Sequence, residues 1–412
     1  MSHIFPPPEN LILHHLNLLS VNCDVLVVGA SSAGLMAAIS AAQSGADVIL
    51  VDRPPSGIGP EHAANTIFSG MATASGIKIE DCYLKHDLEG MQILSPSGRT
   101  VRIPARGFFL DRKRFDEHYR SLAQSCGVSM FSGTVKEAKL QGSRRVVSLD
   151  DCEDDGRIDA RVVVDASGVT SSLARENGLQ PMLHREDIAW AMEADIELKD
   201  LGEEKFFQYW IGSMAPGWKA TFSPAGGDRA TLGVFVRGHG ENVQPFFRSF
   251  LKRFKAYKAA RYRDIESLKI HSIRRGGDPI AVLPGEIVAD SLMVTGGAAG
   301  QSGLAYSMRA GSICGLVAAE ASKKLDVSKK SLSRYEKLWK KEFYWQYRMA
   351  RASLDTLASM KDNEIDRLVA GLSAKNLISC GSFARKAAYA SVAVALSRPK
   401  TLPDLAANLM RG

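Results

Sequence analysis

The sequence predicts a mixed α/β protein that combines a parallel-sheet domain, an inserted antiparallel-sheet domain and a C-terminal helical region. Residues 24–52 read as strand, helix and strand, which is the order and size of a βαβ unit. Two further apolar runs, at 158–165 and 291–295, are typical of strands buried on both faces of a parallel sheet. Between them, residues 187–237 alternate apolar and polar side chains over several runs, which indicates an antiparallel sheet.

The individual elements follow from hydrophobic periodicity and from the residues that break it. A buried strand at 24–29 leads into an Ala-rich helix at 32–45, which Gly45 ends before a second buried strand at 47–52. The other expected elements, in chain order, are strands at 98–104 and 107–111, a helix at 113–126, strands near 128–131 and 134–140, the strand at 158–165, several strands within 187–237, a helix at 243–263, strands near 268–288, the strand at 291–295, a helix at 305–324, and helical segments from 331 onward with breaks near Gly371, Gly381 and Pro399.

The buried strands lie far apart in the sequence and are expected to join one sheet, with the antiparallel segment inserted as a second domain. A chain of 412 residues is long enough for two or three domains. The expected division is an N-terminal extension at 1–20, a first domain at 21–180 with inserted strands near 60–105, a second domain at 181–285, a returning segment of the first domain at 286–330, and a C-terminal helical region at 331–412.

Composition excludes several classes of protein. Hydrophobic residues make up 45% and charged residues 24%, as in globular proteins rather than disordered or collagen-like chains. The six cysteines form no CxxC pair and accompany no histidine cluster, which predicts reduced intracellular thiols and no metal site. No apolar run reaches the roughly 18 residues of a membrane span, and residues 1–20 resemble neither a signal nor a transit peptide. A cytoplasmic protein is therefore expected.

Basic residues are concentrated near the C-terminal end. Residues 331–412 hold 14 Lys/Arg and seven Asp/Glu, an excess equal to the net charge of +7 of the whole chain. Two interpretations stay open: peripheral binding to an anionic membrane surface, or aromatic side chains that pack on the second domain beside a solvated basic face. Nucleic acid is not an expected partner. The aromatic residues concerned are Trp339, Phe343, Tyr344, Trp345 and Tyr347.

A glycine-rich fingerprint, GASSAG, lies between the first strand and the first helix. Gly29 permits the tight turn and Gly34 the close packing of helix on strand, while Ser31 stands where a second glycine is usual. A pyrophosphate would bind the N–H groups of residues 32–34, at the positive end of the helix dipole. Asp52 follows Gly29 by 23 residues, where a carboxylate accepts hydrogen bonds from an adenosine ribose. The pattern favours a Rossmann-type dinucleotide site over a cofactor-free domain of the same fold.

Three further motifs fit such a site, although each alone is more often an ordinary structural element. Arg112 opens a helix and could pair with a phosphate, or it could be a solvated charge. At 165–175 a buried strand ends in a glycine-containing turn before a short helix. At 291–311 a strand runs through a glycine-rich turn into a helix whose N-terminus could stabilise negative charge on a reduced flavin, with Gly303 and Leu304 nearest the ring.

In order and spacing these four motifs resemble the flavoprotein group that includes geranylgeranyl reductases, electron-transfer-flavoprotein:quinone-type dehydrogenases and para-hydroxybenzoate-hydroxylase-like monooxygenases. The resemblance covers residues 24 to about 370, and the geranylgeranyl reductases match best. The stretch at 217–236 is similar to that family's aromatic–Phe–Pro run with the strand after it. The stretch at 335–351, followed by 360–368, is similar to its C-terminal helical region.

The resemblance implies an FAD-dependent reductase of isoprenoid double bonds, with FAD on the first domain and a prenyl lipid or prenyl diphosphate on the second. Trp218, Phe222 and Pro224 would line the cavity for the prenyl chain. His62 and Tyr306 are candidates for the proton donor from position alone. The electron donor would be NAD(P)H or a ferredoxin-type protein. The residues expected to bind FAD or to lie close to it are Gly29, Ser31, Ser32, Ala33, Gly34, Asp52, Arg53, Arg112, Asp165, Gly168, Gly297, Gly303 and Leu304.

The chain departs from the family pattern in three places. The usual Gly-Asp pair, whose aspartate binds the ribityl chain, is Gly296-Gly297, and the loop after Gly300 lacks the family's Asn-Pro-Leu-Thr-Gly stretch. The family's Cys-Gly pair has no counterpart in residues 59–70. Two alternatives therefore remain: an NAD(P)H-dependent flavin monooxygenase on the same scaffold, and a degenerate, non-catalytic flavoprotein that binds lipid or a partner.

Overall fold

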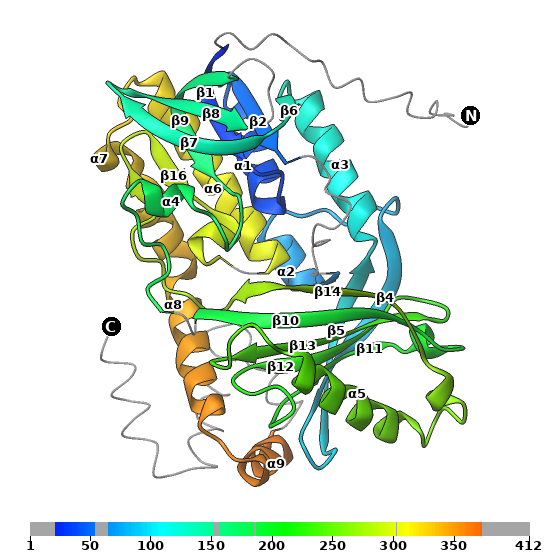
Figure 1. Ribbon diagram of the computed structural model, residues 1–412. Helices are drawn as coiled ribbons and strands as arrows, with labels where there is room; N and C mark the ends of the chain where they lie inside the picture. Colours follow the sequence, from blue (N-terminus) through cyan, green and yellow to red (C-terminus); the bar gives the residue numbers. More distant parts are fainter. Residues whose placement is uncertain (1–20, 54–64, 151–155, 185–186, 302, 373–412) are drawn as a thin grey trace, which may run out of the picture.

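Two sheets form the framework of the molecule, one above the other in Figure 1. The computed structural model describes residues 21–53, 65–150, 156–184, 187–301 and 303–372. The expected N-terminal extension, the breaks near Gly381 and Pro399, and the candidate His62 lie outside these residues. Helices cover the upper sheet, and the long helix α8 runs beside both sheets (Figure 1).

The upper sheet confirms that the buried strands join one sheet. Its order is β15-β16-β9-β1-β2-β6, and β8 pairs with β9 beyond that path. The strands from β16 to β6 pair in parallel, as their apolar runs predict, and the helical crossovers cover them. The bounds are β1 Val21–Val28, β2 Val48–Asp52, β6 Ser129–Ser132, β7 Thr134–Gln141, β8 Arg144–Asp150, β9 Arg157–Asp165, β15 Val288–Ala289 and β16 Leu292–Val294.

Helices α1 (Ser32–Gln43) and α6 (Leu304–Lys323) pack at backbone contact beside this sheet. A Cβ at Gly311 would lie 2.1 Å from the Ala33 carbonyl oxygen, and a Cβ at Gly315 would lie 2.0 Å from that of Ala37. Only glycine at those two positions of α6 allows the approach. The other helices are α2 Ser69–Ala74, α3 Arg112–Ser125, α4 Leu173–Glu176, α5 Gln244–Lys258, α7 Lys329–Leu332, α8 Arg334–Ala358 and α9 Asp362–Gly371.

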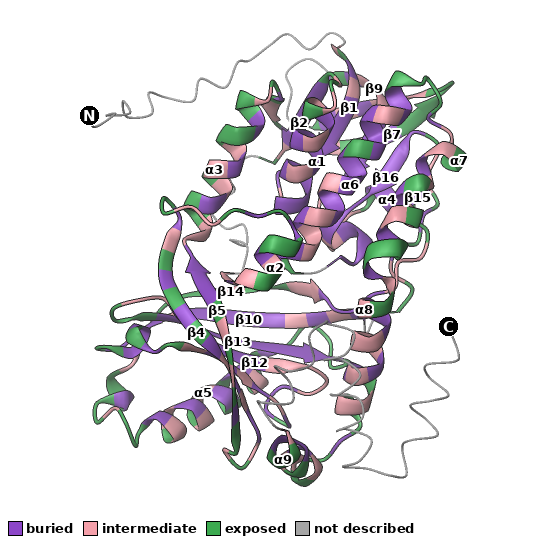
Figure 2. Ribbon diagram, turned by 180° about the vertical axis from the view of Figure 1, so that it is seen from behind, coloured by how far each residue is buried: buried purple, intermediate pink, exposed green. Residues whose placement is uncertain are grey.

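The lower sheet has the order β14-β10-β13-β12-β11-β4-β5-β3. Helix α5 packs on one face of it through a core of mostly buried residues, so α5 covers this face (Figures 1 and 2). The opposite face is turned toward the upper sheet and is called the inner face below. The bounds are β3 Thr66–Phe68, β4 Leu84–Leu94, β5 Thr100–Leu110, β10 Ile188–Glu197, β11 Phe206–Trp210, β12 Lys219–Pro224, β13 Arg229–Arg237 and β14 Lys269–Pro279.

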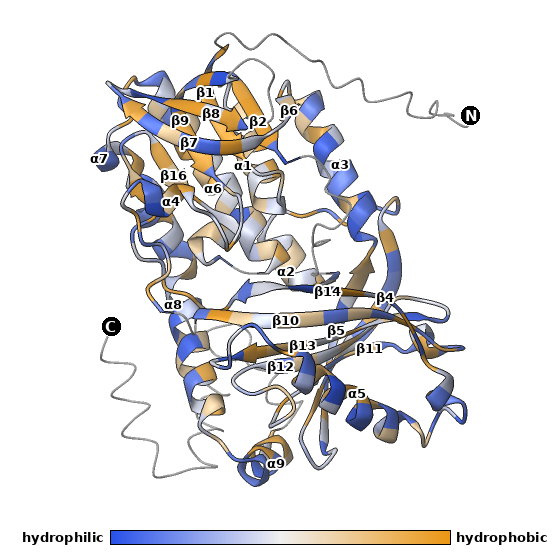
Figure 3. Ribbon diagram, viewed as in Figure 1, coloured by the Kyte–Doolittle hydropathy of each residue, from blue (hydrophilic) through white to orange (hydrophobic). Residues whose placement is uncertain are grey.

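Some expected elements differ from the observed ones. The two strands expected at 98–104 and 107–111 are one continuous strand, β5, because its partner β4 absorbs the irregular spacing with two register shifts. Strand β4 lies within the region near 60–105 where inserted strands were expected, whereas β8 was not expected. Figure 3 shows that both sheets alternate between hydrophobic and hydrophilic colours along several strands, whereas β1, β2 and β9 are mainly hydrophobic. The helix expected at 243–263 ends at Lys258.

Within the described ranges, no helix combines the length and apolar character needed to cross a membrane.

Candidate functional site

The turn between β1 and α1 requires glycine at both ends of its fingerprint. Gly29 has a φ of +97°, and a Cβ there would lie 2.7 Å from the carbonyl oxygen of Ala166 on the neighbouring turn. A Cβ at Gly34 would lie only 1.9 Å from the carbonyl oxygen of Gly29. Side chains are thus excluded from the concave side of the turn, where a ligand backbone or phosphate can approach.

Ser31, the departure from the usual fingerprint, is the N-cap of α1. Its backbone is extended, with a φ of −64°, and its hydroxyl accepts a hydrogen bond from the Gly34 N–H at 3.2 Å. The same hydroxyl donates to the Ala166 carbonyl at 3.2 Å. The serine side chain therefore folds back onto the turn, and the N–H groups of Ser32 and Ala33 remain in the first helical turn, where no intrahelical acceptor exists.

Arg112 lies directly beside this turn. It is the first residue of α3, behind the cap Asp111, and its guanidinium donates to the Ser32 hydroxyl at 2.6 Å. A second interaction with Asp116, one turn further along α3, fixes the guanidinium. The arginine is almost buried, with 9% of its side chain exposed. A positive charge therefore stands at the N-terminus of α1, as binding of a phosphate would require.

The carboxylate of Asp52, at the end of β2, accepts from Arg120 at 2.6 Å. The sequence analysis did not single out Arg120, although it lies eight residues after Arg112 and thus on the same face of α3. Asp52 remains about one-third exposed, and Arg53 after it is exposed. Two arginines of α3 therefore contact the candidate site, Arg112 at the first turn of α1 and Arg120 at the end of β2.

Asp165 holds the turn that follows β9. It is completely buried; one oxygen accepts from the N–H and hydroxyl of Ser167, and the other from the hydroxyl of Ser171 at 2.6 Å. Gly168 has a φ of +96°, and a Cβ there would meet no atom within 4 Å. Both oxygens of Asp165 are thus used within the turn, which leaves the backbone around Gly168 facing open space.

The turn after β16 touches both preceding turns. A Cβ at Gly296 would lie 2.7 Å from the Cβ of Ala33, and a Cβ at Gly297 would lie 3.5 Å from the Cα of Gly168. Gly303, with a φ of +84°, is the N-cap of α6, and Leu304 after it is buried. The three glycine turns of the upper sheet therefore meet, and together they form the candidate cofactor site.

A buried polar cluster, which the sequence analysis missed, holds the last turn in place. The side-chain oxygen of Gln301 accepts from the Gly296 N–H at 2.8 Å and from the Thr295 hydroxyl at 3.1 Å. Its amide donates to the Tyr335 hydroxyl at 2.8 Å, on α8. Burial raises the pKa of Tyr335 well above its ordinary value, so this hydroxyl stays protonated. Gln301 thus fixes a turn that lacks the usual aspartate.

The three residues expected to line the prenyl cavity do not share one environment. Phe222 is fully buried on the α5 face, with its ring centroid 5.2 Å from that of Phe254 and the Lys258 ammonium 4.3 Å above it. Pro224, two residues further along β12, shares that face because side chains alternate along a strand. The expectation is corrected for Phe222 and Pro224, because both lie on the face that α5 covers and neither side chain reaches the inner face. Trp218 packs instead with the inner-face cluster around Phe235.

Other aromatic residues face the upper sheet. Phe207 lies 6.3 Å from Phe68, and 4.8 Å from Tyr209, between ring centroids. Tyr306, near the start of α6, interacts electrostatically with Tyr209, and its ring lies 3.5 Å from the position of a Cβ at Gly303. Burial raises the pKa of Tyr306. Of the two residues predicted as proton donors, Tyr306 is the one within the described residues, and it lies beside the Gly303 turn.

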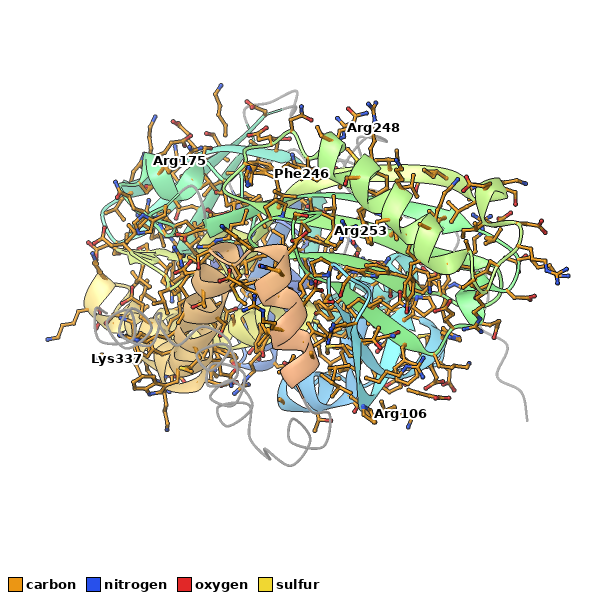
Figure 4. All side chains as sticks on the ribbon, turned by 90° about the horizontal axis from the view of Figure 1, so that it is seen from below. Arg106, Arg175, Phe246, Arg248, Arg253 and Lys337 are labelled. Carbon is orange, nitrogen blue, oxygen red and sulfur yellow. The ribbon has the colours of Figure 1, made fainter. Side chains whose placement is uncertain are left out.

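The aromatic residues of α8 pack mainly on the upper domain rather than on the second domain. Trp339, Phe343 and Tyr347 are buried in the core that includes α6. Trp345 is 66% exposed, and Lys337 projects from the outer side of the helix (Figure 4). Figure 4 also shows Arg248 on the exposed side of α5. Among the described residues, no group of His, Cys, Asp or Glu has a metal-binding arrangement.

Comparisons with known proteins agree with this architecture. A family model described as lycopene cyclase protein matches residues 24–192. The chain is 30% identical over 359 residues to digeranylgeranylglycerophospholipid reductase 1 of Methanothermobacter thermautotrophicus, which covers 84% of this chain and 89% of that protein. The crystal structure of a geranylgeranyl bacteriochlorophyll reductase-like protein from Thermoplasma acidophilum superposes with a TM-score of 0.80, at 22% identity, over 94% of this chain and 100% of that one. A flavin-dependent halogenase superposes with a TM-score of 0.66 at 16% identity, over 93% and 79%.

Proposed function

The chain belongs to the family of the digeranylgeranylglycerophospholipid reductases, and on that premise we propose that it is an FAD-dependent oxidoreductase that reduces carbon–carbon double bonds of an isoprenoid lipid. The observation that carries the proposal is the 30% identity to a named reductase over most of both chains. The halogenase shares the fold at 16% identity, which favours no monooxygenase chemistry here.

The residues of the three glycine turns fit FAD. Gly29 and Gly34 leave the concave side of the first turn free of side chains, and the first N–H groups of α1 point there. Arg112 supplies a positive charge for a phosphate, and Asp52 with Arg53 stands at the end of β2, where the ribose would bind. Gly168, Gly297, Gly303 and Leu304 would contact the flavin end. Ser31 offers no obstacle, because its hydroxyl is folded back.

When bound, FAD in its reduced form supplies a hydride to one carbon of the double bond. The chain's own residues orient the lipid and exclude water from the reacting carbons. The inner face of the lower sheet, with Phe207, Tyr209, Trp218 and Phe235, offers an aromatic wall for a prenyl chain. This wall replaces the set of residues expected from the sequence, of which only Trp218 is retained.

The cofactor assignment is tested by spectroscopy of the purified protein. Wild-type protein should carry a yellow flavin chromophore, whereas Gly34→Val should carry little, because the new side chain overlaps the Gly29 carbonyl. Gly371→Ala is the matched control, since a Cβ at that position meets no atom within 4 Å. Full FAD content in the Gly34→Val protein contradicts the assigned turn.

The substrate is tested by single turnover. Protein reduced with dithionite under anaerobic conditions is mixed with an unsaturated prenyl glycerophospholipid, and mass spectrometry measures the hydrogens added to the chain. Reduction of the lipid supports the proposal. In a separate aerobic assay, rapid oxidation of NAD(P)H with peroxide release and no reduced lipid would support the monooxygenase instead. Assays with NAD(P)H and with a reduced ferredoxin then identify the electron donor.

We also propose that the protein binds peripherally to an anionic membrane through α8. Trp345 and the exposed lysines Lys337, Lys340 and Lys341 lie along α8, and such residues suit the membrane interface. Sedimentation with anionic vesicles at low and high salt tests it, with Trp345→Ser as the variant. Equal sedimentation with neutral and anionic vesicles would leave α8 with a structural role alone.

A further inference from the structure

A row of five residues crosses the lower sheet on its inner face, one from each of five strands. Tyr209 of β11 pairs with Thr221 of β12, Thr221 with Gly233 of β13, Gly233 with Glu193 of β10, and Glu193 with Arg274 of β14. Side chains of directly paired residues point to the same face of a sheet. The carboxyl of Glu193 therefore lies on the same face as Tyr209.

Gly233 leaves the space in which Glu193 lies. A Cβ at Gly233 would be 2.9 Å from the Cγ of Glu193, 3.0 Å from its Oε1 and 2.9 Å from the Oγ1 of Thr221. Glu193 thus leans across β13 toward β12 and occupies the volume of the missing side chain. This orientation carries its carboxyl toward Tyr209, which interacts electrostatically with Tyr306 beside the Gly303 turn.

The carboxyl of Glu193 is buried without a full set of partners. The residue is 6% exposed, and its Oε2 has no hydrogen-bond partner in the described structure. Aromatic rings dominate the surroundings on β11, β12 and β13. The Lys219 ammonium lies 4.8 Å from the Tyr209 ring centroid, 5.1 Å from Trp218 and 5.0 Å from Phe235. An unpartnered buried carboxyl costs stability, so its retention points to a ligand.

Burial raises the pKa of Glu193 to about 8, against the opposing effect of two cations. Arg274 and Lys219 lower the pKa from β14 and β12, while Asp278 of β14 and Asp195 of β10 raise it. Arg274 is held at 2.6 Å by Asp195, which limits the effect of its charge on Glu193. At neutral pH the carboxyl is therefore largely protonated, and a prenyl chain placed on it would exclude water further.

We propose that Glu193 is the proton donor to the lipid double bond, with Gly233 as the residue that gives it room. The inference rests on the proposed function. The electron pair of the π bond forms a C–H bond with the proton of the Glu193 carboxyl, and the other carbon receives a hydride from the reduced flavin. The lipid gains two electrons, the flavin loses two, and Glu193 is left as a carboxylate that regains a proton from water.

The first test is Glu193→Gln, which keeps the shape and hydrogen-bonding capacity but cannot donate an acidic proton. In single turnover with a reduced flavin and an unsaturated prenyl glycerophospholipid, the rate should fall at least 100-fold while KM and FAD content stay unchanged. Glu197→Gln, on the same strand and paired with Arg229 at 2.8 Å, is the matched control and should keep the wild-type rate. A raised KM with an unchanged rate would overturn the proton transfer and leave a binding role.

The second test is independent of turnover. Infrared spectra of the flavin-free protein should show a protonated-carboxyl band that disappears with a midpoint near the pKa of about 8. The band should be missing in Glu193→Gln and retained in Glu197→Gln. Absence of the band from the wild type at pH 6 overturns the proposal. If the wild type shows the band and binds FAD but reduces no prenyl lipid, the proposed function fails, and the proton transfer fails with it. If the wild type and Glu193→Gln reduce the lipid equally fast, only the role of Glu193 fails.

Discussion

Two buried glutamates occupy opposite faces of the lower sheet and differ in how they are paired. Glu204, on the α5 side, accepts from the Lys258 ammonium at 2.6 Å and 2.7 Å, and from the Tyr262 hydroxyl at 3.1 Å. Glu193, on the inner face, has an oxygen with no hydrogen-bond partner in the described structure. Both are less than one-tenth exposed. Burial alone therefore does not distinguish a structural carboxylate from a functional one, whereas the completeness of its hydrogen bonds does.

The rings around the two glutamates differ in the same way. Near Glu204, Phe222, Phe250 and Phe254 form a closed core with α5, and the Lys258 ammonium lies on the Phe222 ring. Near Glu193, the rings of Tyr209, Trp218 and Phe235 surround Lys219, and Tyr306 of the other domain approaches them. One face of the sheet is therefore a finished interior, and the other is a surface between domains.

The largest expected effect comes from opening the closed face. Phe222→Ala should lower the free energy of unfolding by about 3–5 kcal/mol, because it leaves a cavity between the sheet and α5. Urea denaturation measures the change. Trp218→Ala on the inner face is the comparison variant, and it should raise the KM for the lipid more than Phe222→Ala does. A larger effect of Phe222→Ala on KM than on stability would restore Phe222 as a cavity residue.

Breaking the paired glutamate should cost nearly as much. Lys258→Met removes the nearest cation from the buried Glu204 and leaves only Arg261, at 3.8 Å, as a positive partner. Removal of one partner of a buried pair destabilises by about 3–5 kcal/mol. The double variant Lys258→Met with Glu204→Gln should recover part of the loss. FAD binding per folded molecule should stay unchanged. A Lys258→Met protein as stable as the wild type would contradict the structural role of the pair.

The unpaired glutamate predicts a pH dependence of stability with a defined sign. Because the pKa of Glu193 rises from 4.5 in the unfolded chain to about 8 on folding, its contribution is fully present below pH 4.5 and is lost as pH rises through 8. Glu193→Gln cannot ionise, so at pH 9 it should be more stable than the wild type by several kcal/mol. At pH 4.5 the two should be nearly equal. Thermal unfolding at both pH values makes the measurement, and a constant difference would refute the shift.

The smallest effect is expected from filling the space beside Glu193. Gly233→Ala should destabilise by about 1 kcal/mol, because the new methyl group would overlap the Glu193 side chain and the Thr221 hydroxyl. In a Glu193→Ala background the penalty should shrink, since one of the two obstacles is gone. Additive effects of the two substitutions would mean that Gly233 does not make room for Glu193.

The sequence was sufficient for the parallel strands of the upper sheet and for the position of the first glycine turn. Apolar runs predict β1, β2, β9 and β16, because strands buried on both faces need no alternation. Strand β4 carries charged residues at alternate positions, namely Lys85, Asp87 and Glu89, and β8 begins with two adjacent arginines. Both arrangements weaken the apolar signal of short windows. Arg120, Gln301 and Glu193 were missed because each contacts a residue far away in the sequence. These residues are Asp52, Tyr335 and Gly233, respectively, and no local pattern marks such contacts.

The error at Phe222 has a different origin, because the signal was present in the sequence. Strand β12 reads Lys-Ala-Thr-Phe-Ser-Pro, in which Ala220 and Phe222 share one face and Lys219 and Thr221 the other. The more apolar face of an amphipathic strand packs on the hydrophobic core of its own domain, and here that core lies between the lower sheet and α5. Family likeness placed Phe222 at the cavity, whereas strand parity places it against α5 and its neighbours Lys219 and Thr221 on the inner face.

The backbone contact between α1 and α6 has a consequence for the cofactor as a whole. The N-terminus of α1 would receive the pyrophosphate and that of α6 the flavin ring, and Gly311 and Gly315 hold the two helices at a separation with no room for a side chain. Contacts of main-chain atoms then fix the distance between the two binding points. Substitutions elsewhere on either helix can alter charge or shape without changing that length, so the spacing demanded by one cofactor persists while the lipid-facing surfaces diverge.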